Sequence, residues 1–238
     1  MSGNGQPREI WVDHDGGWED IVALLILLRS PDVRVLGITI TPGIASKSTA
    51  LERTQMLLDE LKEREAKLHD EIPKGADVLA TGPLTRIAAN IKTGKAPARL
   101  TWMGGAVDVP GNASRSAEWN AHSDGAALGV VMSSSVPMAL CPLDLTNQFP
   151  ARAGLIEESA QGLRAEVRKA YGEKQRSWWD ELAAASIAAP GIFEKEEVLL
   201  QAAKDGRTYR DARGRKCIVL KKCDRAGFEA LLKQALRY

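Results

Sequence analysis

The chain has 238 residues, of which 44% are hydrophobic and 26% are charged, and its formal net charge is +1. This length is enough to bury the core of one α/β domain spanning 1–238, and the charge gives no general footprint for nucleic acid or an anionic membrane. The longest apolar run, 21–28, is too short to cross a bilayer, and no secretory pattern is expected at the polar start. Three cysteines without metal-type spacing favour reduced thiols, so we expect a cytoplasmic protein.

Apolar runs alternate with helical patterns along the whole chain. Strands are expected at 8–13, 33–40, 76–82, 98–105, 136–144 and the start of 217–238. Helices are expected at 19–31, 46–68, 83–92, 124–134 and the end of 217–238, and residues 162–189 are expected to be mainly helical. Strands that are nearly continuous apolar runs and alternate with helices are typical of a parallel sheet covered on both faces. The sequence therefore predicts a single-domain α/β fold with a mostly parallel, Rossmann-like sheet.

Four carboxylates fall within the nine residues "VDHDGGWED", 12–20, directly after the first predicted strand. Asp13 and Asp15 flank one residue of an extended segment, so their side chains leave the same face. Two glycines then permit a tight turn, which places Glu19 and Asp20 in the first turn of the following helix. Ligands bind at such strand ends in open α/β sheets, and this cluster suits a hard divalent cation. The alternative is that these acids are ordinary cap and first-turn charges.

The segment "VDHDGG" resembles the first motif of the haloacid-dehalogenase-type phosphatases, which bind magnesium. That family requires a hydroxyl where Gly17 stands, a later lysine, and a distal acidic pair after a strand. No such set is evident in this sequence. A magnesium-dependent phosphatase is therefore the weaker alternative.

A second resemblance covers most of the chain between Ile10 and Phe193. The segments "DHDGGWEDIVALLILL", "VRVLGITI", "ATGPLTRIA", "MGGAVDVPGN", "AEWN", "PLDLTNQ" and "WWDELAAAS" resemble, in order, the conserved blocks of the nucleoside hydrolases, which are calcium-dependent N-ribohydrolases. "DHDG", "AEWN" and the tryptophan before the late Asp are most similar to the purine-preferring inosine-adenosine-guanosine branch. The resemblance implies the nucleoside hydrolase fold, hydrolysis of a small ribonucleoside to base and ribose, and a homodimer or homotetramer.

The resemblance also implies roles for individual residues. By matching position, Asp15, Asp20 and Asp180 would bind Ca²⁺ through their side chains and Thr81 through its backbone carbonyl. Asp15 would also be the general base for the attacking water, and Asp13 would orient the cluster from behind. Substrate contacts are implied for Glu19, Met103, Asn112, Glu118, Asn120, Trp179 and Asp180.

Some of these residues have ordinary structural alternatives. Met103 would otherwise be a core residue, and the loop that contains Asn112 would otherwise be a solvated turn. Trp179 matches a residue that stacks on the purine in the resembling branch. Trp18, Trp119 and Trp178 are instead expected to pack in the protein interior.

Three departures from the family pattern concern the ribose pocket. Glu19 stands where the family has Asp, and Ile44 stands where Asn or Asp is common. The chain also passes directly from a charged helix to the strand at 76–82, without the strand and mobile loop that are usual there. These departures support a second hypothesis, a homologue that binds calcium or a ribosyl ligand without hydrolysing it.

The segment 204–222 is the most basic stretch of the chain. A solvated hairpin that turns at Gly214 is the favoured interpretation, and a nucleic-acid patch is the less favoured one. We therefore expect no nucleic-acid partner.

Overall fold

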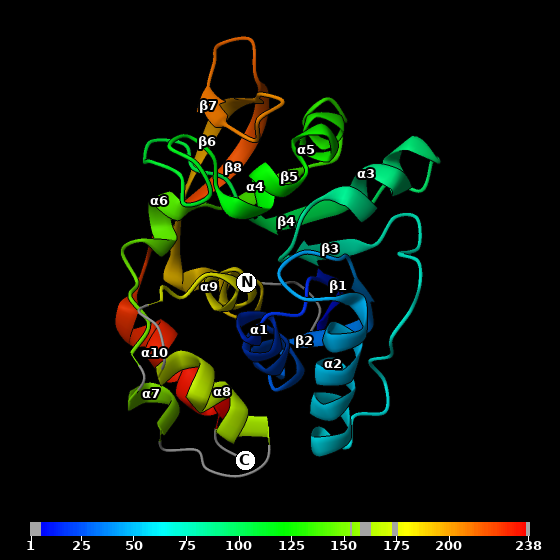
Figure 1. Cartoon of the computed structure of the whole chain (residues 1–238), viewed down its shortest axis with the longest axis vertical. Helices are drawn as coiled ribbons and strands as arrows, with labels where there is room; N and C mark the ends of the chain where they lie inside the picture. Colours follow the sequence, from blue (N-terminus) through cyan, green and yellow to red (C-terminus); the bar gives the residue numbers. More distant parts are fainter. Residues whose placement is uncertain (1–5, 153, 158–162, 173–175, 237–238) are drawn as a thin grey trace.

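The protein is described by a computed structural model that covers residues 6–152, 154–157, 163–172 and 176–236. In this part of the chain one sheet has eight strands in the order β2-β1-β3-β4-β5-β8-β6-β7 (Figure 1). The strands are β1 Arg8–His14, β2 Val33–Ile40, β3 Asp77–Ala80, β4 Arg99–Met103, β5 Met138–Cys141, β6 Phe193–Ala202, β7 Thr208–Arg210 and β8 Arg215–Cys223. The pairs from β2 to β8 are parallel, and β6 is antiparallel to both of its neighbours. The predicted α/β class with a mostly parallel sheet is confirmed.

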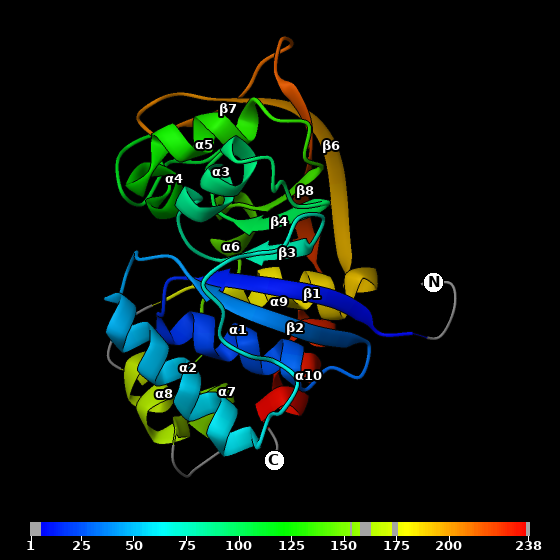
Figure 2. The same cartoon turned by 90° about the vertical axis from the view of Figure 1, so that its right-hand side faces the viewer.

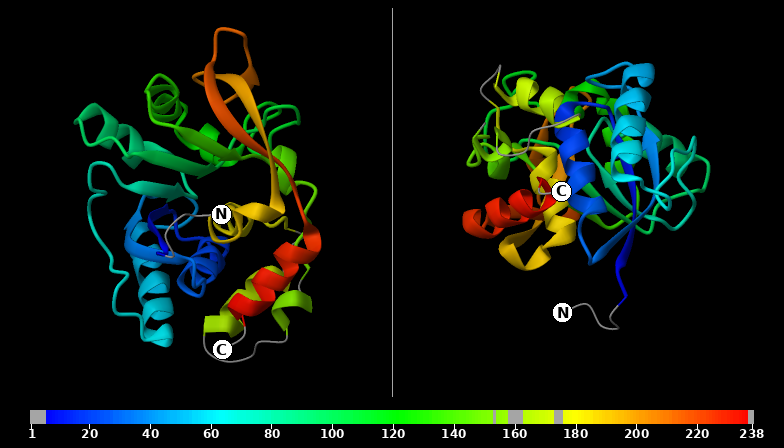
Figure 3. Two further views of the ribbon diagram at one scale, coloured as in Figure 1. Left: turned by 180° about the vertical axis from the view of Figure 1, so that it is seen from behind. Right: turned by 90° about the horizontal axis from the view of Figure 1, so that it is seen from below.

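Helices cover both faces of the sheet, as predicted (Figure 2). Their bounds are α1 Trp18–Leu28, α2 Lys47–Leu61, α3 Thr85–Lys92, α4 Trp119–Ser123, α5 Gly125–Met132, α6 Leu143–Thr146, α7 Gly154–Glu157, α8 Leu163–Gly172, α9 Asp180–Ala188 and α10 Arg225–Leu236. One buried cluster joins α1, α9 and α10 to the sheet, and a second joins α3 and α5 to its other face. Helix α10, red in Figure 3, packs against α1, α7 and α9. Within the described residues, no helix is long and apolar enough to cross a membrane.

The contact between α1 and α9 positions the part of the fold that carries the acidic residues. The run from Ile21 to Leu27 in α1 is buried, since this helix packs against β2 of the sheet and against α2, α8, α9 and α10. Helix α9 presents Ala183, Ala184 and Ala185, which are fully buried. Small side chains let two helices approach closely and leave no room for movement. The first turns of both helices, with Asp20 and Asp180, are thereby held on one side of the sheet.

The predicted helix at 46–68 is too long, because the structure ends it at Leu61. Lys62 adopts the left-handed conformation with a φ of 52° and terminates the helix. The carboxylate of Glu63 then accepts hydrogen bonds from the next three backbone N–H groups, which favours a turn over continued helix. The connector to β3 forms a single parallel bridge to the edge of β2, between Ile38 and Leu68.

One further prediction is wrong. Strand β6 was not predicted, and it separates β7 from β8. Residues 204–222 therefore do not form a self-paired hairpin, although Gly214 does lie in a turn and its N–H donates to the carbonyl of Asp211 at 2.8 Å. This error comes from long-range packing, which local periodicity does not report.

The prediction that 162–189 is mainly helical is confirmed in the described residues, where residues 176–179 separate α8 from α9. Residues 162 and 173–175 of that prediction lie outside the described residues.

Candidate active site

A pocket with an empty volume of about 630 Å³ lies beyond the carboxyl ends of β1, β3 and β4. Strand β1 has β2 on one side and β3 on the other, so the pocket lies where the direction of strand order reverses. All predicted site residues except Asp13 and Asp20 line it, together with Ile44, which the sequence analysis placed near the ribose, and Trp119, which was expected in the interior. The lining residues are Asp15, Glu19, Ile44, Thr81, Met103, Asn112, Glu118, Trp119, Asn120, Trp179 and Asp180.

Asp15 and Asp20 are held by backbone and hydroxyl donors at the base of the pocket. Asp15 accepts a hydrogen bond from the N–H of Ile44 at 3.0 Å. A Cβ added at Gly43 would lie 2.1 Å from Asp15 Oδ2. The backbone at position 43 can therefore approach this carboxylate so closely only because the residue is glycine. Asp20 accepts from Gly17 N at 2.7 Å and from the hydroxyl of Thr81 at 2.5 Å. These donors fix the orientation of both carboxylates.

Negative charge accumulates among the buried carboxylates of the pocket. Burial raises the pKa of Asp15, Asp20 and Asp180 above the usual value. Repulsion by neighbouring carboxylates raises the pKa values of Asp20 and Asp180 further. Within the described residues, no three His, Cys, Asp or Glu side chains are already arranged to hold a metal ion. The calcium site therefore stays a prediction.

Asp13 lies behind the pocket and is completely buried. It accepts hydrogen bonds from the hydroxyls of Thr39 at 2.6 Å and Thr41 at 2.7 Å, and Arg86 Nε lies 3.2 Å away as an ion pair without hydrogen-bond alignment. Burial raises the pKa of Asp13 to about 6, opposed by these three partners. Its backbone carbonyl also accepts from Thr81 N at 2.9 Å. Asp13 thus joins the carboxyl ends of β1, β2 and β3.

Glu118 and Asn120 hold the wall of the pocket that follows β4. The amide of Asn120 donates to the carbonyls of Thr81 and Met103, both at 3.1 Å. A carbonyl oxygen has two lone pairs, so Thr81 keeps one for another partner. The carboxylate of Glu118 accepts three backbone hydrogen bonds, from Gly105, Asn120 and Ala121. Burial raises the pKa of Glu118 to about 7.

Glu19 is paired with an arginine that the sequence analysis did not select. Arg176 Nη1 lies 2.8 Å from Glu19 Oε2, and its guanidinium lies over the ring of Tyr171. The Tyr171 hydroxyl donates to the buried carboxylate of Glu181, which also accepts from Trp179 N at 3.0 Å. Because of burial, the pKa of Glu181 is raised to about 8. The longer side chain of Glu19 therefore reaches a partner of its own.

The tryptophans divide between the pocket and the core. Trp179 lines the pocket, and Trp178 is buried as predicted. The prediction that Trp119 packs in the interior is wrong, because it is 46% exposed and lines the pocket. It is the first residue of the short helix α4, whose buried residues are Asn120 and Ala121. Together with Ile44, which is 53% exposed, Trp119 gives the pocket an apolar rim.

Known proteins resemble this chain along most of its length. A family model described as inosine-uridine preferring nucleoside hydrolase matches residues 60–230. The pyrimidine-specific ribonucleoside hydrolase RihA of Shewanella sp. (strain MR-7) is 26% identical over 210 residues, 66% of this chain and 64% of that protein. The probable uridine nucleosidase 2 of Oryza sativa subsp. japonica is 26% identical over 195 residues, 59% and 58% of the two chains. The chain thus spans less than two thirds of these relatives.

Solved structures have the same fold. The purine-preferring ribonucleoside hydrolase from Gardnerella vaginalis superposes with a TM-score of 0.84 at 19% identity, covering 96% of this chain and 98% of that one. The inosine-uridine preferring nucleoside hydrolase from Bacillus anthracis gives 0.82 at 20% identity, with coverages of 96% and 99%. The shared fold, and a family model that matches well over half of the chain, show that it belongs to the nucleoside hydrolase family.

Proposed function

We propose that this chain hydrolyses the N-glycosidic bond of a ribonucleoside, with Asp15 as the general base. The observation that carries the proposal is the pocket at the switch point of the sheet, which Asp15, Asp180 and Asn120 line together. Membership of a family whose named relatives are ribonucleoside hydrolases supports this reaction. The direct test is release of free base and ribose from a panel of purine and pyrimidine nucleosides.

The residues of the pocket suit a dissociative cleavage. The oxygen of water adds to the anomeric carbon, the bond to the base nitrogen breaks, and the electron pair leaves with the base. Asp15 takes a proton from the water, and its raised pKa makes it a stronger base than an exposed carboxylate. Negative charge from Asp180 stabilises the positive charge that develops on the sugar, whereas the charge of Glu19 is balanced by Arg176.

We propose Ca²⁺ as the cofactor, with Asp15, Asp20, Asp180 and the carbonyl of Thr81 as its ligands. This donor set consists only of oxygen atoms, which a hard cation requires, and a cation would relieve the repulsion that raises the pKa values of the acids. When bound, the ion would lower the pKa of a water molecule and hold ribose hydroxyls.

A purine nucleoside is the proposed substrate class. The indoles of Trp119 and Trp179 both line the pocket and offer flat surfaces for a bicyclic base. Against a phosphatase, the residues that line this pocket in the described chain include no lysine.

Calcium is expected to stabilise the chelator-treated protein by about 2.7 kcal/mol when its concentration is 100 times the Kd. The physical reason is that the ion binds the clustered carboxylates only in the folded state. Thermal unfolding with and without Ca²⁺ measures the shift. Asp20→Asn should lose the shift, and Asp32→Asn, at an exposed position, should keep it. An unchanged melting temperature in the unaltered protein would remove calcium from the proposal.

Glu19→Asp is expected to raise kcat/KM by about 10- to 100-fold, since a displacement of about 1 Å at a reacting centre has effects of that size. The shorter side chain withdraws from Arg176 and returns the carboxylate to the length usual in the family. Steady-state hydrolysis of inosine measures the change, with Glu19→Gln as the control that keeps the length. If neither the natural chain nor Glu19→Asp turns over a bound nucleoside, the second hypothesis holds, a ribosyl-binding homologue without hydrolase activity.

A further inference from the structure

The β6–β7 hairpin contacts the segment that forms one wall of the pocket. We call residues 104–120, which follow β4 and include Asn112, Glu118 and Asn120, the pocket loop. Strand β6 and the short strand β7 are joined by the turn at 203–207, and Ala203 N donates to Arg207 O at 2.9 Å. The turn and β7 lie at the start of the basic stretch 204–222. The proposed reaction assigns no role to this hairpin.

Thr208, at the start of β7, is hydrogen-bonded to the base of the pocket loop. Its hydroxyl accepts from Ala106 N at 3.0 Å and donates to Ala106 O at 3.0 Å, and the residue is 1% exposed. The neighbouring Gly105 donates its N–H to Glu118 Oε2 at 3.0 Å. The Thr208 side chain therefore satisfies both backbone groups of Ala106. Ala106 directly follows Gly105, the residue whose N–H binds Glu118.

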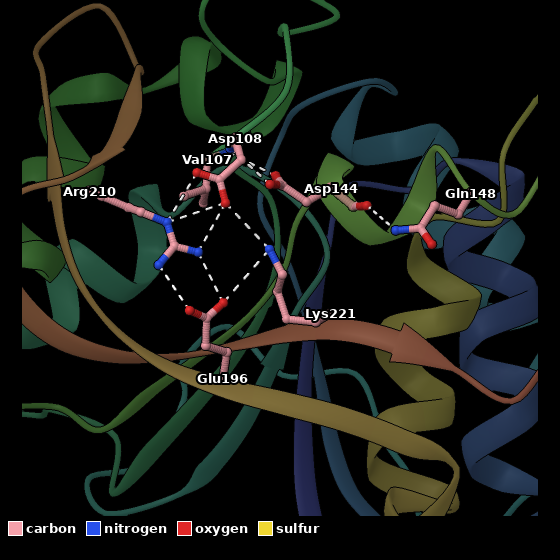
Figure 4. Close-up of polar contacts among 7 residues, drawn as sticks. All are labelled: Val107, Asp108, Asp144, Gln148, Glu196, Arg210 and Lys221. Atoms are coloured by element: carbon pink, nitrogen blue, oxygen red, sulfur yellow. Dashed lines mark hydrogen bonds and ion pairs between the residues drawn. The ribbon is translucent and has the colours of Figure 1, made fainter.

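Arg210, at the end of β7, binds the pocket loop through Asp108 (Figure 4). Its Nε and Nη2 lie 3.0–3.2 Å from the Asp108 carboxylate, and its Nη1 and Nη2 lie 3.0 Å from Glu196 of β6. Lys221 Nζ lies 3.4 Å from Asp108 and 3.8 Å from Glu196. An isolated exposed ion pair contributes little, but bidentate arginine contacts within a network do fix geometry.

The backbone of Asp108 is anchored as well as its side chain. The backbone N–H groups of Val107 and Asp108 both donate to Asp144 at 2.8 Å, as Figure 4 shows. Gln148 in turn donates to the carbonyl of Asp144 at 2.6 Å. Asp108 thus has a fixed backbone, and Arg210 determines where its side chain is held.

The hairpin turn also contacts helix α4, at the two residues that directly follow the pocket loop. His122 Nδ1 lies 2.9 Å from Asp205 O. Gly206, with a φ of +89°, approaches so closely that a Cβ there would lie 2.4 Å from Ala121 O. A glycine at this position permits both the left-handed backbone and the contact. The hairpin therefore contacts the first part of the pocket loop and the residues of α4 that directly follow it.

We infer that Thr208 and Arg210 are positioning residues, which set the pocket loop and with it Asn112, Glu118 and Asn120 against the ligand. Neither lines the pocket, so they act through Ala106 and Asp108. Of the cations in 204–222, Arg210 pairs with Asp108 of the pocket loop, whereas Lys216 and Lys222 pair with Glu197 and Glu194 of β6. The support for the site therefore comes from Thr208 and Arg210.

Hydrogen exchange of the natural chain, Thr208→Val and Thr208→Ser tests the inference without any turnover. Valine has the same shape but no hydroxyl, and serine keeps the hydroxyl. We expect Thr208→Val to raise amide exchange at least about tenfold at Gly105, Asn120 and Ala121, which donate to Glu118, and Thr208→Ser to restore protection. Faster exchange confined to Ala106 would overturn the inference.

The kinetic test rests on the proposed function. Arg210→Ala is expected to raise KM about tenfold with kcat changed less than about threefold, because the loop contacts the bound substrate. Arg210→Lys, which lacks the planar fork, should restore only part of the effect. Lys216→Ala removes the ion pair to Glu197 on the same part of the sheet and should leave KM unchanged. Equal KM values for Arg210→Ala and Lys216→Ala would contradict the inference, whereas an inactive natural chain would refute the hydrolase proposal and leave the exchange result standing.

Discussion

Asp15→Asn is expected to lower kcat for nucleoside hydrolysis by about 10²- to 10⁴-fold, the usual contribution of a general base. Asparagine keeps the shape of the side chain and an oxygen that accepts from Ile44 N, so the pocket retains its form. It cannot take a proton from water and removes one charged donor for a cation. Release of base from inosine, measured with Ca²⁺ in excess, reports the loss. Asp32→Asn, an exposed change of the same chemistry, is the matched control.

Asp15→Asn should raise the stability of the metal-free protein, although it lowers activity. Asp15 is 4% exposed, and its charge contributes to the raised pKa values of Asp20 and Asp180. Removing that charge relieves repulsion in the folded state, so the free energy of unfolding without metal should rise by about 1 kcal/mol. A gain in stability together with lost activity identifies a functional cluster. Retained activity in Asp15→Asn would refute the proposed general base, and a large loss of stability would show that Asp15 is structural.

The part of the site near the N-terminus could be predicted because its geometry is local. Asp13, Asp15 and Asp20 lie on a strand end, a glycine turn and a first helical turn, and each of these has a recognisable sequence pattern. The alternation of apolar runs with helices likewise predicts the parallel sheet. The pocket then forms where such sheets bind ligands.

The residues that were missed act across long sequence distances. Arg176 is 157 residues from Glu19, and Arg86 of helix α3 is paired with Asp13 of strand β1. Surface-like arginines occur throughout the chain, and no local pattern marks these two. Strand β6 escaped prediction for a related reason: its exposed and buried residues do not alternate, because the run 194–197 carries four consecutive charges. Its strand conformation depends on pairing with β8.

Asp13→Ala is expected to lower the free energy of unfolding by about 3–5 kcal/mol, the cost of removing one partner from a buried ion pair. The substitution leaves three donors facing a vacant acceptor position: the hydroxyls of Thr39 and Thr41, and the guanidinium of Arg86. At pH 8 the carboxylate is ionised, since this pH lies above its pKa of about 6. Chemical denaturation at pH 8 measures the difference, and an effect below about 1 kcal/mol would contradict it.

The controls separate the charge of Asp13 from its hydrogen bonds. Thr41→Val removes a single hydroxyl donor and should cost about 1 kcal/mol. Asp13→Asn keeps an acceptor for one threonine but no charge for Arg86, so its loss should be intermediate. The hydrogen bond from Thr81 N to the carbonyl of Asp13 involves only backbone atoms and survives all three substitutions. If activity falls more steeply than stability across this series, Asp13 acts by orienting the carboxylate cluster as well as by joining the strands.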